Sequence, residues 1–208
     1  MDIQDEIISY GVSRETMQKL EKFVAILCEW NEKMNLVSKN SLSDVWVRHI
    51  LDCVQLLKYI DPNTHNLVDI GSGAGFPGIV LAILMKEKMP EVKFFLVESI
   101  AKKTAYLKEV CARIGLDNVE IVNERVENAV FKDVDVITAR AVAALDKLFD
   151  YAYPITKKKT KMIFPKGVSY GEELSSAKHR WNFKQIIHPN KYCEGGVILE
   201  IEELEKRR

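Results

Sequence analysis

The stretch Asn66-Leu67-Val68-Asp69-Ile70-Gly71-Ser72-Gly73-Ala74-Gly75-Phe76-Pro77-Gly78 decides how the rest of this 208-residue chain is interpreted. Its apolar beginning, Leu67–Ile70, predicts a buried strand, and Pro77 suits the first turn of a following helix. Four glycines within eight residues let the backbone turn sharply and let a ligand approach the main chain. Because the free N–H groups at a helix start favour an electron-rich ligand, this turn predicts a nucleotide-type cofactor site.

Strand-like and helix-like segments alternate after the glycine stretch, and this alternation predicts an α/β fold with a mostly parallel, twisted sheet covered by helices on both faces. A further helix is expected near Ser169–His179. The last two expected strands would form an antiparallel pair at one edge of the sheet. The expected strands are Leu67–Ile70, Lys93–Val97, Val119–Val122, Val134–Thr138, Lys184–Ile187 and Val197–Glu202.

The first 60 residues have the apolar periodicity of amphipathic helices. One stripe steps by three and four residues from Leu20 to Met34, and a second runs from Val47 to Leu57. We expect residues 1–62 to form an N-terminal helical segment that packs on the sheet of a domain spanning residues 63–208. Together these parts would make one compact domain, and without an unusual apolar patch in the sequence we expect a monomer.

The overall net charge is zero, but the charge is distributed unevenly. Residues 1–98 hold 10 basic and 14 acidic side chains, whereas residues 99–208 hold 20 basic and 16 acidic ones. The second half could therefore present a basic face to a polyanion, or simply a solvated charged surface.

The four cysteines include no C-x-x-C pair, so neither a zinc site nor a dithiol redox motif is predicted. The histidines have no partner at ligand spacing, and no metal site is expected. The N-terminus lacks the features of a signal peptide, and no apolar run is long enough to span a bilayer. These features predict a cytoplasmic protein.

Three acidic residues around the expected strand ends are candidate cofactor ligands. Asp69 precedes the glycines, where a carboxylate can reach the ammonium group of S-adenosylmethionine. Glu98 ends the second strand, where an acid can accept both hydroxyls of a ribose, unless it is an ordinary exposed acid. Glu127 follows the third strand, where an adenine would lie, but a helix-capping role explains it equally well.

Arg140 follows the fourth strand, at the edge where open α/β sheets bind ligands. A guanidinium there is suited to a carboxylate, a phosphate or the edge of a base, and could also position a substrate. The alternative is an ion pair with a neighbouring acid.

Other cofactor motifs fit less well. A P-loop is excluded because no Gly-Lys-Ser/Thr follows the glycines, whereas Gly73–Gly78 does match the G-x-G-x-x-G pattern of dinucleotide sites. Tyr153 and Lys157 match the Y-x-x-x-K motif of short-chain dehydrogenases, but Pro154 disfavours the continuous helix which that chemistry needs.

Several stretches together resemble the bacterial small-subunit ribosomal RNA guanine-N7 methyltransferases, also called the glucose-inhibited division protein B family. The most particular are Arg48-His49-Ile50-Leu51-Asp52 and the Gly-Phe-Pro-Gly within the glycine stretch. The other matching pieces are Trp30-Asn31, Asn35-Leu36, Glu98-Ser99, Lys102-Lys103, Arg125-Val126-Glu127, Thr138-Ala139-Arg140-Ala141 and Phe164-Pro165-Lys166-Gly167.

The resemblance implies a Rossmann-like methyltransferase fold and the transfer of a methyl group from S-adenosylmethionine to N7 of a guanine in small-subunit (16S) ribosomal RNA, free or in a ribosomal particle. Guanine N7 carries a free lone pair, so no general base is expected and the catalytic task is orientation. By similarity, the cofactor is lined by Gly71, Phe76, Val126, Glu127 and Arg140. The loop and ribose arguments add Gly73 and Glu98.

RNA contacts are expected from basic residues within the matching stretches, through phosphates and a stacked base. The candidates are Arg48, His49, Lys102, Lys103 and Lys166. Three other functions stay open from the residues alone: a methyltransferase for small molecules or proteins, an NAD-dependent oxidoreductase, and a non-catalytic nucleotide sensor.

Overall fold

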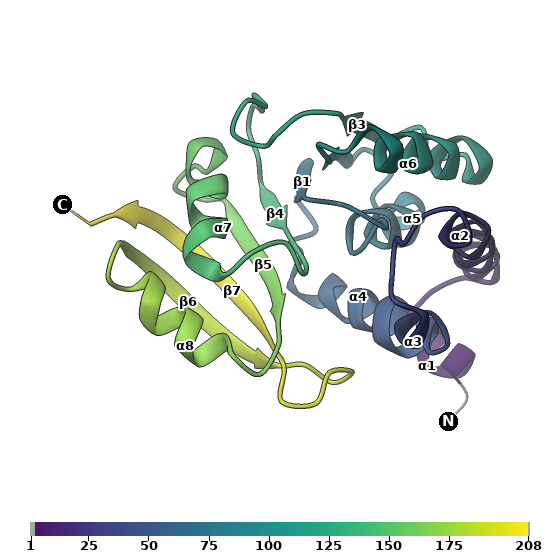
Figure 1. The fold of residues 1–208 in the computed structure, drawn as a ribbon, viewed down its shortest axis with the longest axis horizontal. Coiled ribbons are helices and arrows are strands. Elements are labelled where there is room, and N and C mark those ends of the chain that lie inside the picture. Colours follow the sequence, from purple (N-terminus) through teal and green to yellow (C-terminus); the bar gives the residue numbers. More distant parts are fainter. Residues whose placement is uncertain (1–2, 208) are drawn as a thin grey trace.

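A seven-stranded sheet with the order β3-β2-β1-β4-β5-β7-β6 organises the molecule (Figure 1). The computed structural model describes residues 3–207. Neighbouring strands from β3 to β5 are parallel, whereas β7 runs antiparallel to β5, and β6 antiparallel to β7. The strands are β1 (Asn66–Ile70), β2 (Lys93–Val97), β3 (Val119–Val122), β4 (Val136–Thr138), β5 (Lys161–Lys166), β6 (Trp181–Pro189) and β7 (Val197–Lys206).

Helices connect and cover these strands. The α-helices are α1 (Ile3–Ser9), α2 (Arg14–Asn31), α3 (Lys39–Leu42), α4 (Asp52–Val54), α5 (Gly78–Lys88), α6 (Ala101–Ile114), α7 (Leu145–Ala152) and α8 (Tyr170–Ala177). The shorter helical segments are a π-helical turn η1 (Trp46–Leu51) and two 3-10 turns, η2 (Gln55–Tyr59) and η3 (Tyr153–Ile155).

The connections place a crevice beside the glycine stretch. From β1 the chain proceeds through α5, β2, α6 and β3 toward one edge, and then returns to β4 on the other side of β1. Ligands of open α/β sheets bind where the strand order reverses in this way, outside the carboxyl ends of the strands. The glycine stretch follows β1 directly and therefore lies at this point.

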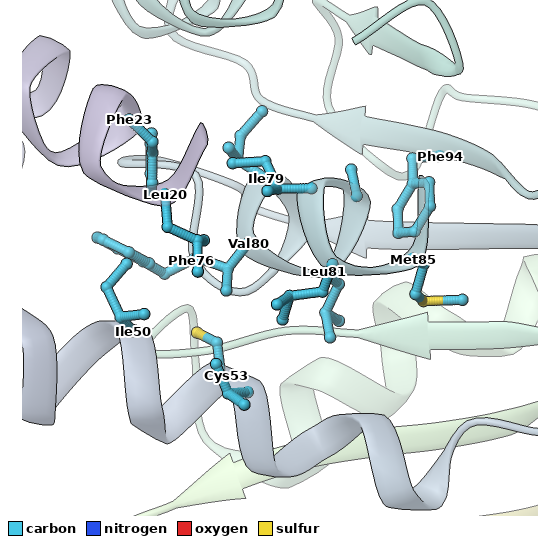
Figure 2. Packing of buried hydrophobic residues seen from close by; sticks show 14 of the residues in the cluster. Leu20, Phe23, Ile50, Cys53, Phe76, Ile79, Val80, Leu81, Met85 and Phe94 are labelled. Atoms are coloured by element: carbon cyan, nitrogen blue, oxygen red, sulfur yellow. The ribbon is translucent and has the colours of Figure 1, made fainter. Parts of the chain in front are cut away.

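The helix after the glycine stretch is held from several sides. Residues from Gly78 to Met85 of α5 are all buried, as expected for a helix that is apolar around its whole circumference. Leu20 and Phe23 of α2 lie on one side of this helix, and Ile50 and Cys53 lie on another, all in one hydrophobic cluster (Figure 2). This packing fixes the start of α5 and, with it, the loop that precedes the helix.

The expected α/β class and the antiparallel C-terminal pair are confirmed. The limits of several elements differ from the predictions: β4 begins at Val136, and β6 and β7 are longer than expected. Helix α7 was not predicted, although Leu145, Leu148 and Phe149 form a buried stripe along it.

The helix predicted from the stripe Val47 to Leu57 consists of three consecutive helical segments, η1, α4 and η2, from Trp46 to Tyr59. The π-helical turn η1 carries Arg48 and His49, and Asp52 follows it directly. Single π-helical turns are rare and often occur at functional sites.

Candidate active site

A cavity of about 320 Å³ lies at the carboxyl ends of β1, β2 and β3, and we call it the β1–β3 cavity. Four of the predicted cofactor residues line it: Gly71, Glu98, Val126 and Glu127. Tyr151 also lines it and was not predicted. The cavity falls in the size range of small-molecule sites, and its position is the one that the strand order favours.

Two hydrogen bonds orient the Glu98 side chain. Its Oε2 accepts from the backbone N–H of Gly73 at 3.1 Å, and its Oε1 accepts from that of Ile100 at 2.8 Å. Glu98 is buried, yet it lines the β1–β3 cavity. Each carboxylate oxygen can accept more than one hydrogen bond, so Glu98 can still receive two hydroxyl donors from a ligand.

Gly71 allows the loop to approach its neighbour closely. The residue has a φ of +67°, and a Cβ at this position would lie 2.7 Å from Cγ2 of Val142. Both the left-handed backbone and the lack of space require glycine. The loop therefore depends on the sequence at Gly71 and on the placement of Val142, two positions far apart in the chain.

Asp69 is a buried acid next to the glycine stretch. Its carboxylate is fully buried beneath the loop, where Oδ1 accepts a hydrogen bond from Thr138 at 2.7 Å and Oδ2 faces Gly78. Burial raises the pKa of Asp69 to about 6, and the hydrogen bond from Thr138 only partly offsets this effect. The carboxylate does not line the β1–β3 cavity but lies against the loop, and its contact with a cofactor ammonium stays a prediction.

A larger cavity of about 950 Å³ opens on the other side of Val142, and we call it the Arg140 cleft. Its lining comes from distant parts of the chain: η1, the segment after β4, the end of β5 and the β6–β7 connection. Val142 lines both cavities, so the two cavities adjoin at this residue. The lining includes Arg48, His49, Asp52, Arg140, Val142, Lys166, Asn190 and Tyr192.

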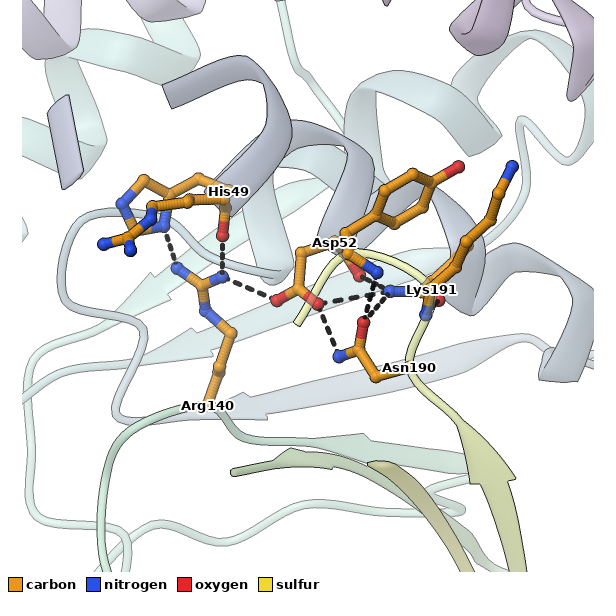
Figure 3. A network of polar contacts seen from close by, with 8 residues as sticks. His49, Asp52, Arg140, Asn190 and Lys191 are labelled. Atoms are coloured by element: carbon orange, nitrogen blue, oxygen red, sulfur yellow. Dashed lines mark hydrogen bonds and ion pairs between the residues drawn. The ribbon is translucent and has the colours of Figure 1, made fainter. Parts of the chain in front are cut away.

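Arg140 is held by groups from η1 and α4 (Figure 3). Its Nη1 donates to Oδ2 of Asp52 at 2.8 Å and to the backbone carbonyl of Arg48 at 3.0 Å. Its Nη2 contacts Nδ1 of His49, and the guanidinium carbon lies 5.1 Å from the centre of the Phe76 ring. The acid paired with Arg140 is thus buried in the cleft wall rather than exposed on the surface.

His49 stacks on Phe76, with ring centres 4.6 Å apart and an angle of 14° between the planes. Burial and the nearby Arg140 charge lower the pKa of His49 to about 4, so the imidazole is neutral near pH 7. A neutral imidazole attracts a phosphate less than the expected cation would. The ring contacts both Phe76 and Arg140 in the wall of the cleft.

Lys166 is also engaged within the protein. Its Nζ donates to the carbonyl of Ala143 at 2.8 Å and to Oε2 of Glu173 at 2.7 Å. The same Glu173 oxygen accepts from the backbone N–H of Leu145 at 2.8 Å. Lys166 and Glu173 therefore fix the segment between β4 and α7, which forms one side of the cleft.

The remaining predicted residues take different positions. Arg48 is exposed at the cleft, but Lys102 and Lys103, at the start of α6, line neither cavity. Gly73 and Phe76 also line neither cavity: Gly73 contacts Glu98, and Phe76 lies beneath Arg140.

The main residue that the sequence predictions missed is Asp52. The sequence does contain an indication that Asp52 is important, because it is an acid within the apolar stripe from Val47 to Leu57. A carboxylate on a buried helix face requires a partner. Its partners Arg140 and Asn190 are far away in sequence, and no local pattern identifies them.

Three further features of residues 3–207 bear on motifs considered in the sequence. No helix in this part of the chain is both long and apolar enough to cross a membrane. Within the same range, no three His, Cys, Asp or Glu side chains are grouped so that they could hold a metal ion. Tyr153 lies in the 3-10 turn η3, which ends before Lys157, so the two residues do not share the helix of a short-chain dehydrogenase site.

Solved structures with a similar fold include a SAM-dependent methyltransferase from Aquifex aeolicus, with a TM-score of 0.56 and 18% identity, which covers 73% of this chain and 90% of that one. Another is a mutant of MtNAS in complex with S-adenosylmethionine, with a TM-score of 0.57 and 14% identity, covering 97% and 76% of the two chains. At these identities the similarity establishes the fold.

Sequence relatives establish the family. The chain is 38% identical over 208 residues to ribosomal RNA small subunit methyltransferase G of Paramagnetospirillum magneticum, covering 100% of this chain and 98% of the relative. It is 41% identical over 195 residues to the protein of the same name from Rickettsia akari, covering 94% and 98%. The family model for rRNA small subunit methyltransferase G, GidB, matches residues 16–197. The chain therefore belongs to the rRNA small subunit methyltransferase G family.

Proposed function

We propose that the β1–β3 cavity and the Arg140 cleft are the two halves of one site, in which S-adenosylmethionine gives its methyl group to N7 of a guanine in small-subunit (16S) ribosomal RNA. As a member of its family, the protein is an S-adenosylmethionine-dependent methyltransferase. The observation that carries the assignment is the position of Val142, which lines both cavities at the switch point of the sheet. A donor in one cavity and an acceptor in the other would therefore come close to each other at this residue.

The β1–β3 cavity has groups that suit an adenosine. Glu98 is fixed by two backbone donors and can accept the ribose hydroxyls. Val126 offers an apolar surface for an adenine, beside the exposed Glu127. Gly71 brings the loop backbone to the cavity, so we assign the methionine end of the cofactor to this side, toward Phe76 and Arg140.

The bound cofactor supplies a methyl group on a positively charged sulfur. Guanine N7 can attack this carbon without losing a proton, so the protein needs no general base. Catalysis then depends on holding the lone pair, the methyl carbon and the sulfur in line, with the reacting atoms roughly 3–3.5 Å apart. The rigid loop after β1 and the anchored Arg140 are suited to such positioning.

The Arg140 cleft is large enough to admit a nucleotide taken out of its stack, as sequence-specific RNA recognition usually requires. Arg48 is exposed beside the cleft and can contact phosphate, while Lys102 and Lys103 would reach RNA only outside it. We further assign the protein to the cytoplasm, as a monomer that acts on ribosomal RNA or a ribosomal particle.

The test is methyl transfer to small subunits, and to free 16S ribosomal RNA, from a strain that lacks the enzyme. Labelled S-adenosylmethionine would be supplied, and the modified nucleotide would be mapped by mass spectrometry. We expect a single 7-methylguanosine. Calorimetry should detect binding of S-adenosylhomocysteine and none of NAD. Methylation of a different base atom, or tighter binding of NAD, would refute the proposal.

A further inference from the structure

Asp52 is a buried acid at the meeting point of three distant segments (Figure 3). Its side chain is 8% exposed, and the Arg140 side chain paired with it is 15% exposed. Asp52 Oδ2 accepts from Arg140 Nη1 at 2.8 Å. Oδ1 accepts from Nδ2 of Asn190 at 2.7 Å and from Nε2 of Gln55 at 3.2 Å. One carboxylate thus connects α4 and its neighbour Gln55 to the end of β4 and to the β6–β7 connection.

The β6–β7 connection is held by hydrogen bonds to Gln55 as well as by the one from Asn190 to this carboxylate. Asn190 Oδ1 accepts from Gln55 Nε2 at 2.8 Å and from the backbone N–H of Tyr192 at 2.9 Å. The backbone N–H of Lys191 donates to Gln55 Oε1 at 3.1 Å. Since Asn190 and Tyr192 both line the Arg140 cleft, the same network shapes the wall opposite Arg140.

Arg140 would have considerable freedom without this network. Its side chain lines the cleft, and an arginine has many accessible rotamers. Asp52, the Arg48 carbonyl and the neutral His49 ring together restrict the guanidinium to one place above Phe76. Of these three groups, only Asp52 carries a charge opposite to that of arginine.

We propose that Asp52 is a positioning residue for methyl transfer, which acts by fixing the Arg140 guanidinium in the Arg140 cleft, two residues before Val142, and is itself held by Asn190. The inference rests on the proposed site, in which Arg140 contacts the cofactor. Asp52 is assigned no contact with the reacting atoms. Its contribution is therefore to the rate with bound substrates rather than to RNA affinity.

The test is a double-mutant cycle between Asp52→Asn and Arg140→Lys, measured as kcat and KM for methylation of small subunits. Asp52→Asn keeps the shape of the side chain but removes its charge. We expect kcat to fall roughly 10- to 100-fold, because the reacting groups would no longer be held in the productive geometry. The KM for RNA should stay within about twofold of the wild-type value. Arg140→Lys keeps the charge but loses the planar fork. In the Arg140→Lys background, Asp52→Asn should lower kcat by less than about twofold, because the group through which it acts has been removed.

Glu200→Gln is the matched control. Glu200 is another buried acid with two basic partners, Lys161 at 2.7 Å and His188 at 2.8 Å, and it lines neither cavity. Its neutralisation should lower the melting temperature about as much as Asp52→Asn does, while leaving kcat unchanged. Should Asp52→Asn fail to fold, Asn190→Ala provides the same test with an expected two- to fivefold fall in kcat, again absent in the Arg140→Lys background.

Multiplicative effects of Asp52→Asn and Arg140→Lys, or an unchanged kcat in Asp52→Asn and Asn190→Ala, would overturn the inference. The proposed function fails differently: wild type and Glu200→Gln would then also show no methylation of guanine N7. The two failures are therefore distinguishable in one set of assays.

Discussion

The two cavities of this protein are built in different ways. The β1–β3 cavity is formed by the ends of consecutive strands, and its loop follows β1 without interruption. The Arg140 cleft is assembled from side chains at positions 48–52, 140–144, 166 and 190–194, which only the tertiary structure brings together. The first cavity relies on backbone conformation, and the second on ion pairs and hydrogen bonds between distant segments. Changes to the loop should therefore impair cofactor binding, and changes to the cleft should impair the use of RNA.

The largest effect is expected from Gly71→Ala. Alanine would have to adopt the left-handed backbone conformation of Gly71, at a cost of about 1–2 kcal/mol. Its Cβ would also lie 2.7 Å from Cγ2 of Val142. The loop must then move, and we expect the affinity for S-adenosylhomocysteine to fall about 100-fold in a calorimetric titration.

Gly115→Ala is the control for Gly71→Ala. Gly115 has a φ of +79°, but a Cβ there would meet nothing within 4 Å, and the residue ends α6 away from both cavities. This variant should lose about 1–2 kcal/mol of stability and keep its affinity. Equal affinity losses in the two variants would show that backbone strain alone matters.

Glu98→Ala should have the second largest effect on cofactor affinity. It removes the acceptor of two backbone N–H groups and the expected ribose ligand. Hydrogen bonds to a charged group contribute about 1.5–3 kcal/mol, so the affinity for S-adenosylhomocysteine should fall about 10- to 100-fold. Glu120→Ala, at an exposed position of β3, should leave it unchanged. A loss of RNA methylation with intact cofactor affinity would remove Glu98 from the cofactor site.

The burial of Asp69 predicts a pH dependence of stability. Its pKa is about 6 in the folded protein against an ordinary 3.8, so the folded state binds this proton more tightly than the unfolded chain does. The protonated Asp69 therefore adds to the free energy of unfolding. This contribution is complete below about pH 4 and is lost as the pH rises through 6. Asp69→Asn should therefore gain stability relative to wild type over this range, on the order of 2 kcal/mol, as measured by urea unfolding. A constant difference between pH 4 and 7 would contradict the assigned burial.

The smallest effect is expected from Arg48→Gln, at the exposed rim of the cleft. Loss of a phosphate contact should raise KM for RNA about three- to tenfold and reduce the salt dependence of binding by about one unit of slope. Affinity for S-adenosylhomocysteine should not change. Lys93→Gln removes the same charge at the opposite end of the sheet, at the start of β2, and should change neither quantity.

The sequence predicted the local cavity better than the assembled cleft. Gly71, Glu98, Val126 and Glu127 line the β1–β3 cavity because the ends of parallel strands meet at one edge, a rule that needs no knowledge of side-chain contacts. Glycine spacing and strand periodicity likewise predicted the positions of most strands and the mostly parallel sheet.

The pairing of Asp52 with Arg140 and Asn190 could not be predicted, because each residue has several conceivable partners and only the tertiary structure selects one. The same applies to Lys166. The sequence predicted that it contacts RNA phosphates, but it did not predict the ion pair between Lys166 and Glu173. Asp69 lies under the loop, with Oδ2 against Gly78, and its contact with a cofactor ammonium stays a prediction.

The reversed direction of β7 has a further consequence. Lys166 at the end of β5 pairs with Val197 at the start of β7, and Val197 pairs with Pro189 at the end of β6. The hairpin between β6 and β7 therefore projects from the same edge as the glycine stretch, although it comes from the opposite end of the chain. A hairpin tip tolerates insertions and substitutions more readily than a strand. Relatives with the same sheet could therefore acquire a preference for another RNA site by changing the residues of this hairpin that lie beyond the Asn190 network, without disturbing the methyl donor.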